Sequence, residues 1–318
     1  MKIAVLDDYQ NVALTMADWS NLQRRCTVEI FNDHLVDPDA IAARLEPFDC
    51  VVVMRERTPM TASLLENLPN LRLLVTTGGA NASIDLAAAT RLGIQVEATE
   101  TMPYPTSELT WALILTLCKR IPQNVAAMRD GRWQDGLSLD LRGRTLGLVG
   151  LGRLGTMVAR VANAFRMDVI AWSRSLSEQD AIERGARRVE FDELLRRSDI
   201  VSIHTQLSDR TRGLIGTREF ALMKPSALLV NTSRGPIVDE AALISALASG
   251  TIAGAATDVY DAEPFGAEHP LMSAPNLLTT PHIGYVTRPT YEVYFRDVVA
   301  NIEAWLEGRV LRPLNTLG

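Results

Sequence analysis

Cysteine and histidine, the residues most used to bind transition metals, are scarce in this chain of 318 residues. There are three cysteines, Cys26, Cys50 and Cys118, and four histidines. The cysteines are widely spaced and odd in number, so no pair has zinc-ligand spacing and none lies beside an obvious catalytic base. We therefore expect buried, unreactive thiols in a reducing compartment, and no metal site.

Long apolar runs and an excess of positive charge are missing as well. No apolar run approaches the roughly 20 residues that a membrane-spanning helix needs. The chain reaches Asp7 and Asp8 too early for a signal peptide. A net charge of −6 argues against a broad surface for nucleic acid or anionic lipid. These absences predict a cytoplasmic protein that has neither a nucleic acid nor a membrane as its partner.

What the chain does have is enough apolar sequence for about two globular domains. Hydrophobic residues make up 47% of it and the mean hydropathy is +0.05, which is typical of a soluble globular protein. Near the N-terminus, short β-branched runs alternate with helical patterns. Strands are predicted at 3–6, 28–31, 51–54 and 71–76, and helices at 39–45 and 61–67. Near-continuous apolar strands separated by helices indicate a parallel sheet covered on both faces.

A second region of the same class follows a long helix that is predicted at about 107–120. Pro103 and Pro105 precede this helix and indicate a crossing between domains. Strands are then predicted at 145–149, 168–172, 200–204, 227–231 and 252–259. The last helix, at 290–307, has nothing left to pack on in the second domain and is expected to return to the first. The predicted first domain is therefore discontinuous (1–101 and 288–318), and the second spans 102–287.

A glycine-rich turn joins the first two strands of the second domain. The strand at 145–149 runs into this turn, a helix follows, and another apolar strand comes about 20 residues later. The glycines permit a tight turn and close approach of the backbone to a pyrophosphate, which the partial positive charge of the helix N-terminus favours. We predict dinucleotide binding by Gly150, Gly152, Arg153, Leu154 and Gly155. A glycine-rich turn without a ligand is the alternative.

The end of the next strand bears on which dinucleotide is bound. NAD-binding proteins usually place Asp or Glu there to accept hydrogen bonds from ribose hydroxyls. This chain has Ser173, Arg174 and Ser175 instead. A carboxylate would repel a 2′-phosphate, whereas hydroxyls and a guanidinium would bind it. These residues predict NADP(H) as the favoured cofactor, with NAD(H) possible; a solvated loop arginine is the alternative for Arg174.

Three later loops each supply one polar group behind an apolar run. They are the guanidinium of Arg234, the carboxylate of Glu263 and the imidazole of His282, which we call the polar trio. Reduction of a keto acid needs an anion clamp, a proton donor and a group that keeps the donor protonated. The polar trio meets all three needs if the fold brings it together. Of the other histidines, His34 and His269 lie in polar, loop-like segments and are predicted to be solvated.

Taken in order, these segments resemble the D-isomer-specific 2-hydroxyacid dehydrogenase family. The matching stretches are 150–155, 198–204, 223–225, 231–235, 253–260, 263–264 and 281–284, and the similarity covers almost the whole chain. The resemblance implies an α/β fold of two doubly wound parallel-sheet domains, a Rossmann coenzyme domain inserted into a flavodoxin-like substrate domain. It also implies a homodimer, with the active site in the interdomain cleft.

The reaction that the resemblance implies is NAD(P)-dependent hydride transfer between a small 2-keto acid and the D-2-hydroxy acid, as in the glyoxylate and hydroxypyruvate reductase branch. Arg234 would bind the carboxylate and carbonyl oxygens of the substrate, for which its fork of donors is suited. His282 would be the general acid in reduction and the general base in oxidation. Glu263 would orient the ring of His282 and favour its charged form. A structural ion pair for Arg234 and a surface position for Glu263 are the alternatives.

The resemblance also implies weaker contacts with cofactor and substrate. Asp258 is expected near the nicotinamide amide. Together with Asp258, the further residues that are implied to contact the cofactor are Thr106, His204, Thr205, Thr232, Ser233 and Gly284. The segment 76–85 resembles the family's carboxylate-binding loop, which implies substrate contacts for Gly79 and Ala80. Arg55 is a further candidate for the substrate, with a solvated position at the end of its strand as the alternative.

The chain departs from the family pattern in places that bear on the substrate. The family commonly has glycine where Ala80 stands, and Asp-Asn or Asp-His where Ala82 and Ser83 stand. The usual proline after the residue that follows His204 is missing too; Gln206 takes its place. These departures leave the reaction class intact and leave the identity of the 2-keto acid open.

Other functions stay open on the sequence alone. A binding protein of the same fold would sense the NAD(P) redox state without turnover, but we would expect it to have a damaged trio or added tails. A phosphoglycerate dehydrogenase is possible, although no regulatory domain follows the last helix and no extra basic cluster for a phosphate is evident. Formate or phosphite oxidation normally uses NAD. Methyl transfer from S-adenosylmethionine would leave the polar trio unexplained.

Overall fold

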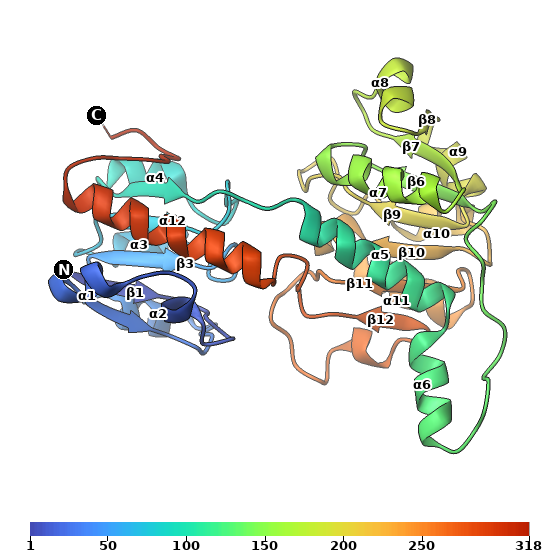
Figure 1. Ribbon diagram of the computed structural model, residues 1–318, viewed down its shortest axis with the longest axis horizontal. Helices are drawn as coiled ribbons and strands as arrows, with labels where there is room; N and C mark the ends of the chain where they lie inside the picture. Colours follow the sequence, from blue (N-terminus) through green and yellow to red (C-terminus); the bar gives the residue numbers. More distant parts are fainter. Residues whose placement is uncertain (318) are drawn as a thin grey trace. The chain divides into compact units, whose positions relative to one another are not determined.

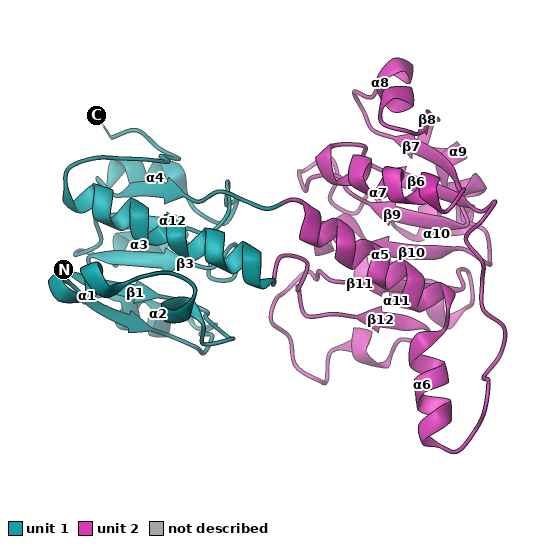
Figure 2. Ribbon diagram, in the orientation of Figure 1, with its two compact units in different colours: residues 1–102, 287–318 teal, residues 103–286 magenta. Residues whose placement is uncertain are grey.

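Residues 1–317 are described by a computed structural model, in which the chain divides into two compact units. The first unit consists of Met1–Met102 with Thr287–Gly318, and the second of Pro103–Val286 (Figure 2). Each unit is an α/β structure built around one parallel sheet (Figure 1). The chain therefore leaves the first unit once and returns to it with its last helix.

Five parallel strands form the sheet of the first unit, in the order β2-β1-β3-β4-β5. The strands are β1 (Lys2–Val5), β2 (Thr27–Ile30), β3 (Cys50–Val53), β4 (Leu73–Thr76) and β5 (Gln95–Ala98). This is the flavodoxin-like order, in which ligands bind outside the carboxyl ends of the strands. β3 and β4 are buried along their whole length, as their continuous apolar sequences predict.

The sequence pattern does not predict β5, because polar residues interrupt it. Gln95 and Glu97 are nevertheless buried. The carboxylate of Glu97 accepts hydrogen bonds from the backbone N–H groups of Leu311 at 3.1 Å and Arg312 at 3.0 Å. The segment after the last helix thus covers this edge strand and supplies partners for its polar side chains.

The helices of the first unit have clear local signals. They are η1 (Ala13–Thr15), α1 (Ser20–Arg25), α2 (Pro38–Leu45), α3 (Ala62–Glu66), α4 (Leu86–Arg91) and α12 (Arg288–Leu306). Asp37, Thr61 and Asp85 cap α2, α3 and α4 by accepting a hydrogen bond from a backbone N–H of the first turn. In α12, Phe295 packs against Trp19 with ring centroids 6.4 Å apart. This last helix lies in the first unit, where the sequence pattern puts it.

Seven parallel strands form the sheet of the second unit, in the order β12-β11-β10-β9-β6-β7-β8. They are β6 (Thr145–Val149), β7 (Asp168–Trp172), β8 (Arg187–Arg188), β9 (Ile200–Ile203), β10 (Leu228–Asn231), β11 (Gly254–Thr257) and β12 (Leu277–Thr279). Read from β8, this is the 3-2-1-4-5-6 order of the Rossmann fold with one further strand at the edge. The Rossmann prediction is confirmed.

Helices cover both faces of the second sheet. They are α5 (Tyr104–Cys118), α6 (Ile121–Arg129), α7 (Arg153–Ala164), α8 (Glu178–Glu183), α9 (Phe191–Arg197), α10 (Thr217–Leu222), η2 (Gly235–Ile237), α11 (Glu240–Ala248) and η3 (Pro270–Ser273). Neighbouring residues of β6 point to opposite faces: Leu148 packs with Trp111 of α5, and Val149 lies in the core that contains Phe220 of α10. Two separate cores therefore hold the sheet.

Several sequence-based boundaries differ from the structure. The strand predicted at 252–259 is shorter in the structure, where only β11 is a strand. After β11 the chain bends into a loop, in which the Thr257 hydroxyl donates to the carbonyl of Val259. The pattern does not predict α6, or β8 and β12, which are too short to give a periodic signal. None of the helices within residues 1–317 has the length and apolar character needed to cross a membrane.

Candidate active site

The glycine-rich turn between β6 and α7 is closely packed on the protein side and open on the other. Gly150 has φ +102°, and a Cβ there would lie 2.7 Å from the carbonyl carbon of His204. A Cβ on Gly155 would lie 2.3 Å from the carbonyl oxygen of Gly150, so α7 rests directly on the turn. A Cβ on Gly152 would meet nothing within 4 Å. This arrangement fits a dinucleotide, whose pyrophosphate needs unobstructed approach to the backbone at this point.

The residues after β7 are accessible to solvent in part. Ser173 is half-buried, and Arg174 and Ser175 are exposed. A further cation lies nearby that sequence reasoning missed: Arg184, at the end of α8, donates from Nη1 to the carbonyl of Leu151 at 2.8 Å. It stabilises the glycine-rich turn from a position 33 residues away in the chain, and no local pattern announces that contact.

His204 follows β9 and is half-buried against the glycine-rich turn. Its Nε2 lies 2.9 Å from the hydroxyl of Ser202. Burial lowers the pKa of His204 to about 4, so its ring is neutral near pH 7. A neutral imidazole is a poor proton donor, which leaves His204 beside the nucleotide position rather than in acid–base chemistry. The carbonyl of its neighbour Thr205 accepts a hydrogen bond from Ser233, which joins the ends of β9 and β10.

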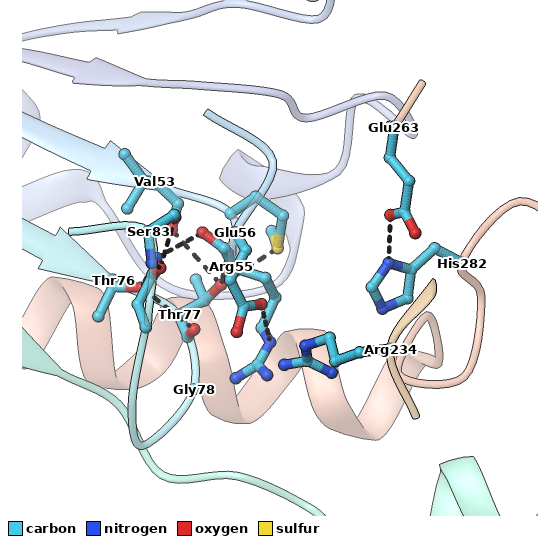
Figure 3. Close-up of polar contacts among 12 residues, drawn as sticks. Val53, Arg55, Glu56, Thr76, Thr77, Gly78, Ser83, Arg234, Glu263 and His282 are labelled. Carbon is cyan, nitrogen blue, oxygen red and sulfur yellow. Dashed lines mark hydrogen bonds and ion pairs between the residues drawn. The ribbon is translucent and has the colours of Figure 1, made fainter. Parts of the chain in front are cut away.

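Two members of the polar trio are in direct contact. The Nδ1 atom of His282 lies 2.5 Å from Oε2 of Glu263 (Figure 3). The side chain of His282 is 24% exposed and that of Glu263 30%, so solvent reaches the pair but screens it only in part. The other carboxylate oxygen of Glu263 accepts the backbone N–H of Tyr260 at 2.8 Å. The carboxylate is held at both oxygens and presents one of them to the ring.

Arg234, the third member, lies directly beyond the end of β10. The Asn231 side chain orders this turn, since its amide donates to the carbonyl of Arg234 at 3.0 Å and its oxygen accepts the N–H of Ser233 at 3.0 Å. The guanidinium donates to the carbonyl of Ser233 at 2.8 Å. The next residue, Gly235, packs on the backbone of Tyr260, where a Cβ would come within 2.0 Å. The segments carrying all three members of the trio therefore meet at Tyr260.

Asp258 ties the loop of His282 to the end of β11. Its carboxylate accepts hydrogen bonds from the hydroxyl of Thr280 at 2.6 Å and from the N–H groups of Ile283 and Gly284, both at 2.8 Å. Burial raises the pKa of Asp258, and these three donors oppose that shift. Thr106 of α5 donates to the carbonyl of Gly284 at 3.1 Å.

Thr232 lies in the same part of the second unit. Its hydroxyl lies 2.8 Å from that of Thr110 in α5, and both side chains are buried. The structure thus gathers Thr106, Thr232, Asp258 and Gly284 around the strand ends that carry the polar trio.

The carboxylate-binding loop expected in the first unit follows β4. Gly78 has φ +90°, and its N–H donates to the hydroxyl of Thr99 at 2.7 Å. A Cβ on Gly78 would overlap Nη1 of Arg55, at 1.8 Å, so the guanidinium of Arg55 lies against this loop. The side chain of Arg55 is 18% exposed, and its Nε is 3.6 Å from Oε2 of Glu56 (Figure 3). The fully solvated alternative for Arg55 is therefore wrong.

The rest of this loop is held by its own side chains. Asn81 donates to the carbonyl of Arg55 at 2.6 Å and to the hydroxyl of Thr76 at 2.9 Å, and its oxygen accepts from Ser83. Gly79 and Ala80, between these anchors, are exposed.

The predictions for the remaining histidines need correction. His34 is not solvated: its Nδ1 lies 2.8 Å from the buried carboxylate of Asp7, and its side chain is 11% exposed. His269 is half-buried, 3.7 Å from Glu240 and stacked near Phe265. The polar neighbours of these histidines in the sequence suggest exposure to solvent, whereas in the structure residues distant in the chain contact both rings.

The cysteine prediction holds for two of three residues. Cys50 and Cys118 are buried free thiols, and burial raises the pKa of Cys50 well above its usual value and that of Cys118 to about 11. Cys26 is only half-buried. Residues 1–317 contain no group of three or more histidine, cysteine, aspartate or glutamate side chains that could hold a metal ion.

Known proteins are similar to this chain in both sequence and fold. Residues 111–284 match the family model for "D-isomer specific 2-hydroxyacid dehydrogenase, NAD binding domain". A glyoxylate reductase from Aeropyrum pernix is 42% identical over 257 residues, which are 78% of this chain and 77% of that protein. The crystal structure of a phosphoglycerate oxidoreductase from Vibrio cholerae O395 has a TM-score of 0.91 and 37% identity, and the match covers 97% of this chain and 99% of that one.

A D-3-phosphoglycerate dehydrogenase from Archaeoglobus fulgidus is similar over a smaller part of its length. It is 38% identical over 240 residues, which are 74% of this chain but only 46% of that protein. The chain therefore spans about half of this relative and most of the glyoxylate reductase.

The contrast between Gly152 and Gly155 gives a test of the nucleotide position. Gly152→Ala should leave the melting temperature unchanged, because its Cβ meets no protein atom within 4 Å, and should weaken dinucleotide binding about tenfold or more by obstructing the phosphates. Gly155→Ala should lower both, because its Cβ overlaps the carbonyl of Gly150. Thermal unfolding and fluorescence titration with NADPH measure the two effects. Undiminished NADPH binding by Gly152→Ala would place the phosphates elsewhere.

Proposed function

This chain belongs to the D-isomer specific 2-hydroxyacid dehydrogenase family, and from that premise we propose that it works as a glyoxylate or hydroxypyruvate reductase that prefers NADPH. As a member of that family it is an NAD(P)-dependent enzyme that interconverts a 2-keto acid and a D-2-hydroxy acid. The proposal concerns the substrate, the preferred coenzyme and the residues that act. The observation that carries it is the contact of 2.5 Å between His282 and Glu263 beyond the strand ends of the second unit.

In this proposal His282 holds the proton that reduction consumes. Glu263 accepts a hydrogen bond from the Nδ1–H of His282 and so orients the ring, and the Nε2–H of the ring would face the substrate oxygen. Arg234 binds the substrate's carboxylate and carbonyl oxygens and stabilises the negative charge that develops on the carbonyl. When NADPH is bound, it supplies the hydride. In the reverse direction the neutral His282 takes the proton back.

We assign coenzyme binding to the glycine-rich turn and the strand ends of the second unit. Gly150, Gly152, Arg153, Leu154 and Gly155 would hold the pyrophosphate, and Asp258 and Gly284 would lie near the nicotinamide. The absence of a carboxylate at Ser173, with Arg174 beside it, supports a preference for the 2′-phosphate of NADPH. Arg184 would add positive charge close to the turn.

We assign recognition of the substrate carboxylate in the first unit to the loop of Gly79 and Ala80, with Arg55 as an added cation. The exposed position of these two residues and the guanidinium packed on Gly78 support this. The loop would hold the carboxylate end that all 2-keto acids share. Oxidation of 3-phosphoglycerate is a second candidate, which the similarity to phosphoglycerate dehydrogenases favours.

Removal of the side chain of His282 or of Arg234 should stop turnover without weakening the binding of the coenzyme. For His282→Ala we expect kcat with glyoxylate or hydroxypyruvate to fall by about 10²–10⁴ because the general acid is gone. For Arg234→Ala we expect a fall of about 10²–10³ because charge on the oxygen is no longer stabilised. The dissociation constant for NADPH should stay near that of the wild type in both. Near-normal kcat/KM in either variant would refute the role assigned to that residue.

Coenzyme preference can be measured directly with a panel of keto acids. Oxidation of NADPH and NADH at 340 nm, with glyoxylate, hydroxypyruvate and phenylpyruvate, should give a higher kcat/KM with NADPH, and Ser173→Asp should reverse the order because its carboxylate repels the 2′-phosphate. Equal or better use of NADH by the wild type would contradict the preference. Reduction of NAD⁺ or NADP⁺ by 3-phosphoglycerate, without turnover of the three keto acids, would favour the second candidate. No turnover of any substrate would indicate a sensor of the coenzyme.

A further inference from the structure

We propose that Tyr260 is a positioning residue that fixes the geometry of the polar trio; the proposal rests on the function proposed above. Tyr260 lies shortly beyond the end of β11 and is buried, with 6% of its surface exposed. It belongs to none of the substrate or coenzyme contacts assigned above. Its backbone and its side chain nevertheless touch the segments that carry Arg234, Glu263 and His282.

The first contact fixes Glu263. The N–H of Tyr260 donates to Oε1 of Glu263 at 2.8 Å, while Oε2 of the same carboxylate lies 2.5 Å from Nδ1 of His282. A carboxylate held at both oxygens cannot rotate about its last bond without losing one of the two partners. The plane of the carboxylate, and with it the direction of the bond to the ring, is therefore set from the backbone of Tyr260.

The second contact fixes the turn that carries His282. The hydroxyl of Tyr260 lies 2.8 Å from the carbonyl oxygen of Thr280 and 3.1 Å from that of Thr257. The Thr280 carbonyl also accepts the N–H of His282 at 2.9 Å. His282 has φ +51°, a left-handed conformation that costs free energy for any residue with a Cβ and persists only where its surroundings hold it. The tyrosine hydroxyl is one of the groups that hold it.

The third contact leads to Arg234. Gly235 packs so tightly on Tyr260 that a Cβ there would lie 2.0 Å from the carbonyl carbon of the tyrosine. The ring of Tyr260 is in turn covered edge-on by Phe265, with centroids 4.5 Å apart. Burial raises the pKa of Tyr260, so its hydroxyl keeps its proton and stays a donor across the working pH range. One residue thus links the ends of β10, β11 and β12, through its backbone to the first and through its hydroxyl to the other two.

The hydroxyl can be removed without disturbing the ring. Phenylalanine would keep the packing on Phe265 and the backbone contacts to Glu263 and Gly235. It would lose only the hydrogen bonds of the hydroxyl to the carbonyls of Thr280 and Thr257. Asp258 holds the same turn from its other side, through the hydroxyl of Thr280 and the N–H groups that follow His282. We therefore expect a displaced ring rather than an unfolded loop.

The test compares Tyr260→Phe with Tyr291→Phe. Tyr291 is a matched control, because it is also a buried tyrosine, and its hydroxyl donates to Gln10 at 3.1 Å within the first unit. For Tyr260→Phe we expect kcat for keto acid reduction to fall about tenfold, in line with the cost of small misplacements of reacting groups, with an unchanged dissociation constant for NADPH. Tyr291→Phe should lose similar thermal stability and keep the kcat of the wild type.

A readout without turnover separates this proposal from the proposed function. In the proton NMR spectrum, the hydrogen bond between His282 and Glu263 should give a downfield resonance that is absent in Glu263→Gln. In Tyr260→Phe this resonance should shift or disappear, whether or not the protein reduces any keto acid. An unchanged resonance, an unchanged kcat, or a loss of stability alone as in Tyr291→Phe would each overturn the positioning role. A wild-type protein with the resonance but without turnover would refute the proposed function and not the role of Tyr260.

Discussion

In the second unit a carboxylate and an imidazole from two irregular segments meet at 2.5 Å, and the proposed chemistry depends on that contact. An imidazole donates a proton readily only when it is charged, and a neighbouring carboxylate favours the charged form. Neither Glu263 nor His282 lies in a helix or a strand, so nothing local holds them in register. Their separation is set by hydrogen bonds that Tyr260 donates and Asp258 accepts. Both residues follow the end of β11.

The order of the strands explains why these groups meet. β10, β11 and β12 are neighbours in a parallel sheet, so their carboxyl ends lie along one edge. Arg234 comes after the first, Glu263 after the second and His282 after the third. β6 and β9 end along the same edge, and there the glycine-rich turn packs on His204. The edge of one sheet thus carries both the glycine-rich turn and the polar trio, although their residues are spread from 150 to 282.

What could be predicted from the sequence is what has a local signal. The bounds of β6 and β7 agree with the predicted strands, because an apolar run leading into a glycine-rich turn is a strong local pattern. The polar trio could be found by residue type and by resemblance. β5 could not, since Glu97 finds its partners in a segment over two hundred residues away. The same holds for His34, whose polar neighbours suggest solvent while Asp7 binds its ring.

The residues that orient the trio left the least trace in the sequence. Tyr260 and Asn231 act largely on backbone groups, and a hydrogen bond to a carbonyl or an N–H leaves no pattern of residue types. Arg184 reaches the glycine-rich turn only because α8 folds back beside it. The homodimer and the cytoplasmic location stay predictions from the sequence.

Keto acid reduction by Glu263→Gln tests the central claim most directly. The amide keeps the shape of the carboxylate but removes its negative charge and one of the two oxygens that accept hydrogen bonds. The account predicts that kcat falls about tenfold or more, because the ring of His282 is no longer held in place, while the dissociation constant for NADPH is unchanged. A kcat equal to that of the wild type would contradict it, because the contact between Glu263 and His282 would then have no part in catalysis.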